Sequence, residues 1–163
     1  IDCKPADADN AYSLLFRWKM EWLHELIPLF VKQQYGRILS IESISVKHPL
    51  PSLALSTSLR LAVIGYLKTL ANETAANGIT INILAPGYHD TPALNRILKN
   101  TAAEKKIPIE EAKQILQDSV PVKKLGNPDH LGSLALFLLS PFSEFITGQT
   151  FSIDGGSNPY LFG

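Results

Sequence analysis

The segment GITINILAPG, residues 78–87, decides the fold. Its central part, ITINIL, is short, apolar and rich in β-branched residues, which predicts a buried strand over residues 79–84. Gly78 directly follows a long helical pattern and is the expected C-terminal cap of that helix. The Pro86-Gly87 pair then predicts a turn. The segment therefore joins a helix, a buried strand and a loop.

The same alternation continues on both sides of this segment. Apolar residues at helical spacing predict helices over residues 9–34, 53–77, 91–118 (broken near Ile107-Pro108) and 127–139. Pro28 lies inside the first of these and predicts a kink. Short apolar runs predict further strands at 37–41 and 148–154, and residues 46–52 read as a loop with two prolines. This order indicates an α/β fold: a doubly wound, Rossmann-like parallel sheet with helices on both faces.

Bulk properties exclude several classes of protein. The 163 residues carry no formal net charge, which argues against a nucleic-acid partner or an anionic membrane surface. Cys3 is the only cysteine, so neither an internal disulfide nor a cysteine zinc site is expected, and a reducing cytoplasm fits. No run of 18 apolar residues predicts a membrane span, and the first ten residues are not those of a signal peptide.

Three stretches carry a family resemblance: YGRILSIES (35–43), LKTLANETAANGITINILAPGYHDT (67–91) and VKKLGNPDHLGSLALFLLSPFSEFITGQTFSIDGG (122–156). Together they resemble the C-terminal half of a short-chain dehydrogenase/reductase. The resemblance implies an NAD- or NADP-dependent oxidoreductase that acts on a small carbonyl or alcohol compound. It also implies a helical lid at about 88–120, whose apolar residues favour a hydrophobic or acyl substrate, and a homo-oligomer.

The nucleotide-binding half of such enzymes begins with a glycine-rich turn that receives the pyrophosphate at a helix N-terminus. No G-x-G-x-x-G or G-x-x-x-G-x-G pattern occurs in this sequence. We therefore expect that half to be absent from this chain, and the chain alone not to bind NAD or NADP. The first strand should then have an unpaired edge where the missing strands belong.

The resemblance also assigns the catalytic positions. The family tyrosine and lysine fall on Ser56 and Arg60, the asparagine of the family's tetrad falls on Leu15, and the strand-end serine is kept as Ser43. A serine hydroxyl is a far weaker acid than a phenol, and arginine does not release its proton in practice. The usual Tyr-Lys mechanism is therefore expected to be disabled. The alternative is structural: Ser56 caps the helix and Arg60 pairs with a carboxylate.

Other groups near the expected site are candidate proton donors. His48 lies in the loop between Ser43 and Ser56 and titrates near neutrality. Tyr88 and His89 follow the Pro-Gly turn, and the plain alternative is that all three are exposed loop residues. Lys47 reads as a surface charge. Glu42 precedes Ser43 on the strand and should point to the opposite face, away from the site.

The expected cofactor-facing residues are Arg60, which could bind a ribose diol, and Pro86, Gly87 and Thr91 in the loop after the second strand. No metal site is expected. Two hypotheses remain: a divergent NAD(P)-dependent oxidoreductase, or a non-catalytic member of the same fold that binds a ligand or partner. Trp18 and Trp22 read as packing or subunit-interface residues. Apolar residues beyond one helical stripe also suggest a helical subunit interface: Phe16, Leu23, Phe30, Leu61, Ile64, Tyr66 and Leu67.

Overall fold

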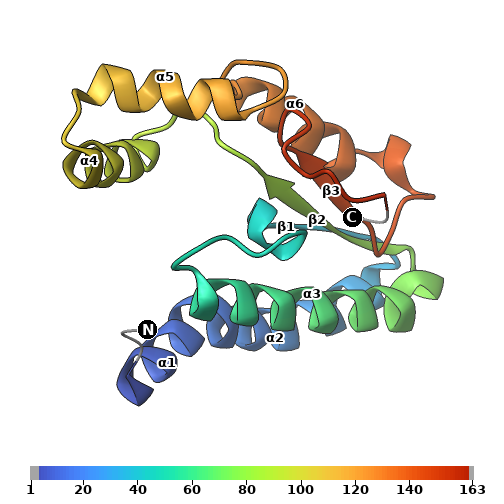
Figure 1. The fold of residues 1–163 in the computed structure, drawn as a ribbon. Coiled ribbons are helices and arrows are strands. Elements are labelled where there is room, and N and C mark those ends of the chain that lie inside the picture. The colour runs from blue at the N-terminus through green and yellow to red at the C-terminus, as the bar shows by residue number, and fades with distance from the viewer. Residues whose placement is uncertain (1–3, 162–163) are drawn as a thin grey trace.

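The computed structural model describes residues 4–161 and is built on a parallel three-stranded sheet. The strands are β1 (Gly36–Ile41), β2 (Ile79–Pro86) and β3 (Thr150–Ile153), in the order β1-β2-β3. Gly36 pairs with Ile79, and Ile83 pairs with Thr150. The predicted parallel sheet is confirmed, with β2 at its centre (Figure 1).

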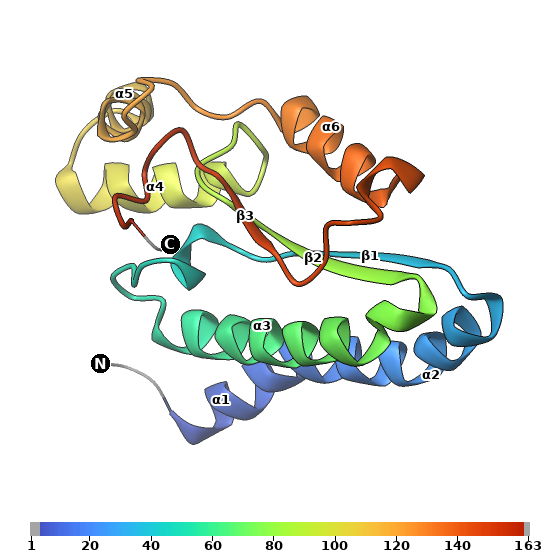
Figure 2. The same cartoon turned by 90° about the vertical axis from the view of Figure 1, so that its right-hand side faces the viewer.

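Helices cover both faces of this sheet, as predicted. On one face lie α1 (Pro5–Tyr12), α2 (Trp18–Gln33) and α3 (Ala54–Thr74), and on the other lies α6 (Pro128–Leu139) (Figure 2). Two further helices, α4 (Leu94–Lys105) and α5 (Ile109–Ser119), lie beyond the end of β2, in the region expected to form a lid. Shorter turns are the π-helical Ser13–Arg17 and the 3-10 turns Ile44–Val46, Ala75–Asn77 and Pro141–Ser143.

Several helix boundaries differ from the sequence prediction for local reasons. The first helical stretch begins at Pro5 rather than residue 9, because proline suits the first turn of a helix. It ends at Gln34, which adopts the left-handed conformation (φ 55°), and not at Gly36. Gly36 instead begins β1, where a Cβ atom would lie 2.9 Å from the Phe30 ring. The break before α5 and the Asn127 cap of α6 are confirmed.

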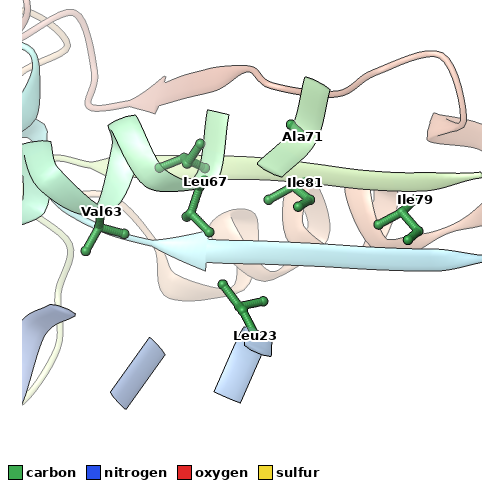
Figure 3. Packing of buried hydrophobic residues seen from close by; sticks show 7 residues of the cluster. Leu23, Val63, Leu67, Ala71, Ile79 and Ile81 are labelled. Atoms are coloured by element: carbon green, nitrogen blue, oxygen red, sulfur yellow. The ribbon is translucent and has the colours of Figure 1, made fainter. Parts of the chain in front are cut away.

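The core lies between β2 and the α2–α3 layer. Val63, Leu67 and Ala71 of α3 pack on Ile79, Ile81 and Ile83 of β2, with Leu23 of α2 completing the cluster (Figure 3). Burying an aliphatic side chain contributes about 1.5–3 kcal/mol. Asn82 is also buried, and its side chain holds the loop that precedes β3: its Nδ2 donates to Ile146 O and its Oδ1 accepts from Gln149 N.

Strand β1 forms an edge of the sheet, and among residues 4–161 no strand pairs with its outer side. An apolar groove of about 520 Å³ runs along this edge and is lined partly by Leu15, Trp18 and Trp22. The expected open edge is therefore present in the described chain. The two tryptophans remain substantially exposed, at 47% and 64%. By contrast, Leu23 and Leu67 lie in the core, which removes them from the suggested subunit interface.

Candidate functional site

The candidate site lies where β1 and β2 end. In a parallel sheet with helices on both faces, ligands bind at the carboxyl ends of the strands. Two hollows meet there: the groove beside β1, which includes Arg60, and a pocket of about 380 Å³ between the end of β2 and α4. Ile41, the last residue of β1 and half exposed, lines both.

Ser56 and Arg60 face each other on α3, as their spacing predicts. Arg60 Nε donates to Ser56 Oγ over 3.2 Å, one helical turn apart. The Nη1 of the same guanidinium donates to Glu42 Oε2 over 2.9 Å. The alternative in which Arg60 pairs with a carboxylate therefore describes the geometry. The Arg60 side chain is 22% exposed, so part of it still faces the groove.

Glu42 overturns the prediction that it points away from the site. Its side chain is fully buried, and three donors surround the carboxylate: Lys19 Nζ and Ser40 Oγ reach Oε1 at 2.5 Å, and Arg60 reaches Oε2. The strand alternation correctly separates Glu42 from Ser43. However, the face to which Glu42 points is the one that α2 and α3 cover, and both helices send cations to it.

Ser43 and His48 are placed less favourably for chemistry. Ser43 Oγ accepts a hydrogen bond from Ser45 N over 3.2 Å and caps the turn Ile44–Val46. The His48 ring lies 6.3 Å from the ring of Tyr160, and its buried Nδ1 has no hydrogen-bond partner within residues 4–161. Neither residue makes a hydrogen bond to Ser56 or Arg60 in this part of the chain.

The loop residue Lys47 is half buried rather than a plain surface charge. Burial lowers the pKa of Lys47, and the positive charge of Lys68 lowers it further. The loop that separates Ser43 from Ser56 therefore packs against the body of the protein, and the Lys47 ammonium is partly removed from water.

Pro86, Gly87 and Thr91, the expected cofactor-facing residues, line the pocket at the end of β2. Apolar residues of the lid and of α6 complete the wall, among them Leu94, Ile97 and Leu131, and Arg96 adds a positive charge. Gly87 is required for packing, because a Cβ atom there would lie 2.8 Å from Asp154 Cβ. Arg60 lines the neighbouring groove and not this pocket.

His89 is buried and not an exposed loop residue. Its Nδ1 lies 3.1 Å from Gly87 O, and its ring packs so closely on Gly126 that a Cβ there would approach within 2.6 Å. His89 and Gly126 also form an isolated parallel bridge. His89 thus ties the loop after β2 to the segment before α6. Tyr88 is half buried and lines a hollow of about 280 Å³ beside it.

Sequence reasoning missed Glu42, Lys19 and Ser40 as partners in the site. One signal was available for Lys19: it lies four residues after Leu15 and four before the buried Leu23, on the apolar face of its helix. A lone cation on such a face needs a buried counter-charge. The nearest strand offers one only at Glu42.

Within residues 4–161, no group of three or more His, Cys, Asp or Glu side chains is arranged to hold a metal ion. No helix in this part of the chain is long and apolar enough to span a bilayer.

A parallel α/β sheet with helices on both faces and a candidate site at its carboxyl edge places the chain in the doubly wound class of α/β proteins. The family model described as enoyl-(acyl carrier protein) reductase matches residues 1–158. The chain belongs to the short-chain dehydrogenase/reductase family.

Curated relatives include nodulation protein G of Azospirillum brasilense, 33% identical over 82% of this chain and 50% of its own. The 3-oxoacyl-(acyl-carrier-protein) reductase FabG of Thermotoga maritima is 31% identical over 96% of this chain and 59% of its own. The chain thus spans about half the length of the curated relatives it matches.

Solved structures agree with this assignment. YwfH, an NADPH-dependent reductase involved in bacilysin biosynthesis, superposes with a TM-score of 0.92 at 26% identity, over 98% of this chain and 61% of its own. A gluconate 5-dehydrogenase from Burkholderia cenocepacia, in complex with NADP and tartrate, gives 0.84 at 28% identity, over 98% and 59%.

Proposed function

We propose that this chain forms the substrate-side half of an NAD(P)-dependent oxidoreductase that interconverts a carbonyl and an alcohol, with an altered proton-transfer site. The observation that carries the proposal is a pair of adjoining hollows at the carboxyl ends of β1 and β2, which share Ile41. Arg60, hydrogen-bonded to Ser56, lines one, and the Pro86-Gly87 turn lines the other. Relatives named as reductases and dehydrogenases support the reaction class.

The residues present fit one end of a nicotinamide dinucleotide. The pocket lined by Pro86, Gly87 and Thr91 has about 380 Å³ and a mainly apolar wall, which suits a flat ring with one polar edge. Arg60, partly exposed in the next hollow, has a donor group for ribose hydroxyls. This sequence contains no glycine-rich turn that could bind the pyrophosphate of the dinucleotide, so the chain by itself should hold the dinucleotide weakly.

When bound, the nicotinamide supplies or accepts the hydride. The protein's task is then to orient the substrate oxygen and to exchange a proton with it. Ser56 offers a hydroxyl, and Arg60 stabilises negative charge on it through Nε without giving up a proton. This arrangement binds and polarises an oxygen better than it protonates one. We therefore propose that the usual Tyr-Lys proton transfer is disabled in this protein.

The site geometry also favours a second candidate: a member of the same fold that binds a ligand or partner without catalysis. Arg60 is held by Glu42, and the Ser43 hydroxyl is engaged with Ser45 N. Two of the groups expected to act on a substrate oxygen thus have partners within the protein. A protein that binds NADPH and a carbonyl compound yet transfers no hydride would establish this second function.

The test uses the chain fused to the glycine-rich, nucleotide-binding half of a Tyr-Lys relative. NADPH and NADH are titrated by fluorescence energy transfer from Trp18 and Trp22, and turnover is followed at 340 nm with a panel of apolar ketones. Slow but measurable turnover supports the oxidoreductase, whereas binding of neither nucleotide contradicts it and favours the non-catalytic candidate.

We further propose a homo-oligomer with a cytosolic setting. Phe142 and Phe145 are 88% and 101% exposed and lie in the segment between α6 and the edge strand β3. Trp22 is 64% exposed on α2. Exposed aromatic groups of this kind favour a symmetric interface. Sedimentation should give at least a dimer at micromolar concentration, and a monomer would contradict the assembly.

A further inference from the structure

A buried carboxylate at the end of a strand demands compensation, and Glu42 receives it from two helices. Transfer of an ionised carboxylate into the protein interior is unfavourable unless the charge is paired and its oxygens accept hydrogen bonds. Glu42 has no side-chain exposure, and its backbone N–H donates to Leu84 O over 2.8 Å, which fixes it to β2. Its carboxylate is therefore rigidly placed.

The two carboxylate oxygens divide the partners between them. Oε1 accepts from Lys19 of α2 and from Ser40 of β1, and Oε2 accepts from Arg60 of α3. Lys19 and Arg60 are 15% and 22% exposed, so both cations are largely enclosed. The cluster joins three elements and leaves one positive charge in excess at the mouth of the site.

Glu42 also decides what the Arg60 guanidinium can do. With Nη1 on Glu42 and Nε on Ser56, the planar group is held along two of its edges. The hydrogen bonds thus run from Ser56 through Arg60 and Glu42 to Lys19. They connect α3, which carries the exchanged Tyr and Lys positions, with α2, which directly follows the π-helical turn that carries the exchanged Asn position, Leu15.

We propose that Glu42 is a positioning residue, which clamps Arg60 against Ser56 and, together with Lys19, forms a charge cluster that joins α2 to α3. The role of Arg60 toward a cofactor rests on the proposed function, but the clamp itself does not. A lysine at position 60 would meet the same carboxylate. Restoring Tyr and Lys at positions 56 and 60 therefore leaves the ammonium captured until Glu42 is also replaced.

The clamp is tested by the hydrogen exchange of arginine Nε–H groups, measured by ¹⁵N NMR on the whole protein. Arg17 is the internal control, because its Nε also donates to a glutamate, Glu21, over 2.7 Å, but on the exposed surface. The Arg60 Nε–H should exchange at least about tenfold more slowly than that of Arg17, as expected for an enclosed hydrogen bond of a charged group. Equal exchange rates in the native protein overturn the proposal without any variant.

The variant Glu42→Gln keeps the side-chain shape and removes the charge. Arg60 exchange should accelerate by about tenfold or more, whereas the control Glu21→Gln should leave it unchanged. If Glu42→Gln does not fold, Glu42→Asp keeps the charge, withdraws it by one methylene and should give the same acceleration. Unchanged Arg60 exchange in a folded Glu42 variant overturns the clamp. Failure to bind nicotinamide nucleotides with Arg60 still protected overturns the proposed function alone.

Discussion

Replacing Glu42 by glutamine should destabilise the protein substantially. The carboxylate is fully buried and serves two cations, Lys19 and Arg60, which would lose their counter-charge while remaining largely enclosed. Removing one partner of a buried ion pair costs about 3–5 kcal/mol. Because both cations are slightly exposed and the amide still offers an acceptor oxygen, we expect about 2–3 kcal/mol for Glu42→Gln.

Urea denaturation measures this change, with the fluorescence of Trp18 and Trp22 as the signal, since both lie on α2 near Lys19. In thermal unfolding the same loss corresponds to a decrease in Tm of roughly 4–12 °C for a domain of this size. The matched control is Glu21→Gln, which removes an ion pair to Arg17 whose two side chains are 59% and 56% exposed. That control should unfold at the same urea concentration as the native protein. A Glu42→Gln variant that also unfolds at the native urea concentration would refute the reasoning.

Two further predictions concern glycine packing and pH. Gly87→Ala should destabilise the protein by about 1–3 kcal/mol, because its Cβ would lie 2.9 Å from the Asp154 Cα atom. Gly65→Ala in α3 meets no atom within 4 Å and should instead stabilise it by about 0.5–1 kcal/mol, so equal Tm shifts for the two variants would contradict the packing. For the second, burial and Lys68 lower the folded-state pKa of Lys47 below its ordinary 10.5. The unfolded chain therefore binds more protons, and stability should rise with pH between the lowered pKa and the ordinary value. Urea titrations at several pH values should show that Lys47→Met flattens this rise. An unchanged dependence of the unfolding free energy on pH would contradict the prediction.

Much of the fold could be predicted because local signals agree with one another. The β-branched run before Pro86 and the Asn127-Pro128 signature each identify an element, and alternation of helices with strands implies parallel pairing. The ends of the helices were harder to predict. Gln34 ends its helix in a left-handed conformation that favours glycine, and only the close packing of Gly36 on Phe30 explains why the glycine lies two residues later.

Sequence reasoning brought some of the candidate residues together but did not predict the electrostatics around them. Spacing along one helix is enough to bring Ser56 to Arg60, and the turn after β2 brings Thr91 to Pro86 and Gly87. The partners of Glu42 come from elements distant in the sequence, 23 residues away for Lys19 and 18 for Arg60. Which long side chain reaches a buried carboxylate depends on how the helices pack, and strand alternation alone does not specify it.

The most direct test of the central claim measures ketone reduction by the chain fused to the nucleotide-binding half of a Tyr-Lys relative. The native form, the double variant Ser56→Tyr/Arg60→Lys and the triple variant that adds Glu42→Ser are compared at saturating NADPH. The loss of a positioned general acid costs about 10²–10⁴-fold, so native turnover should be lower by that factor than in Tyr-Lys relatives. Turnover should rise in the double variant and rise further in the triple variant. Fast native turnover that survives Ser56→Ala, with no gain in either variant, would contradict the account.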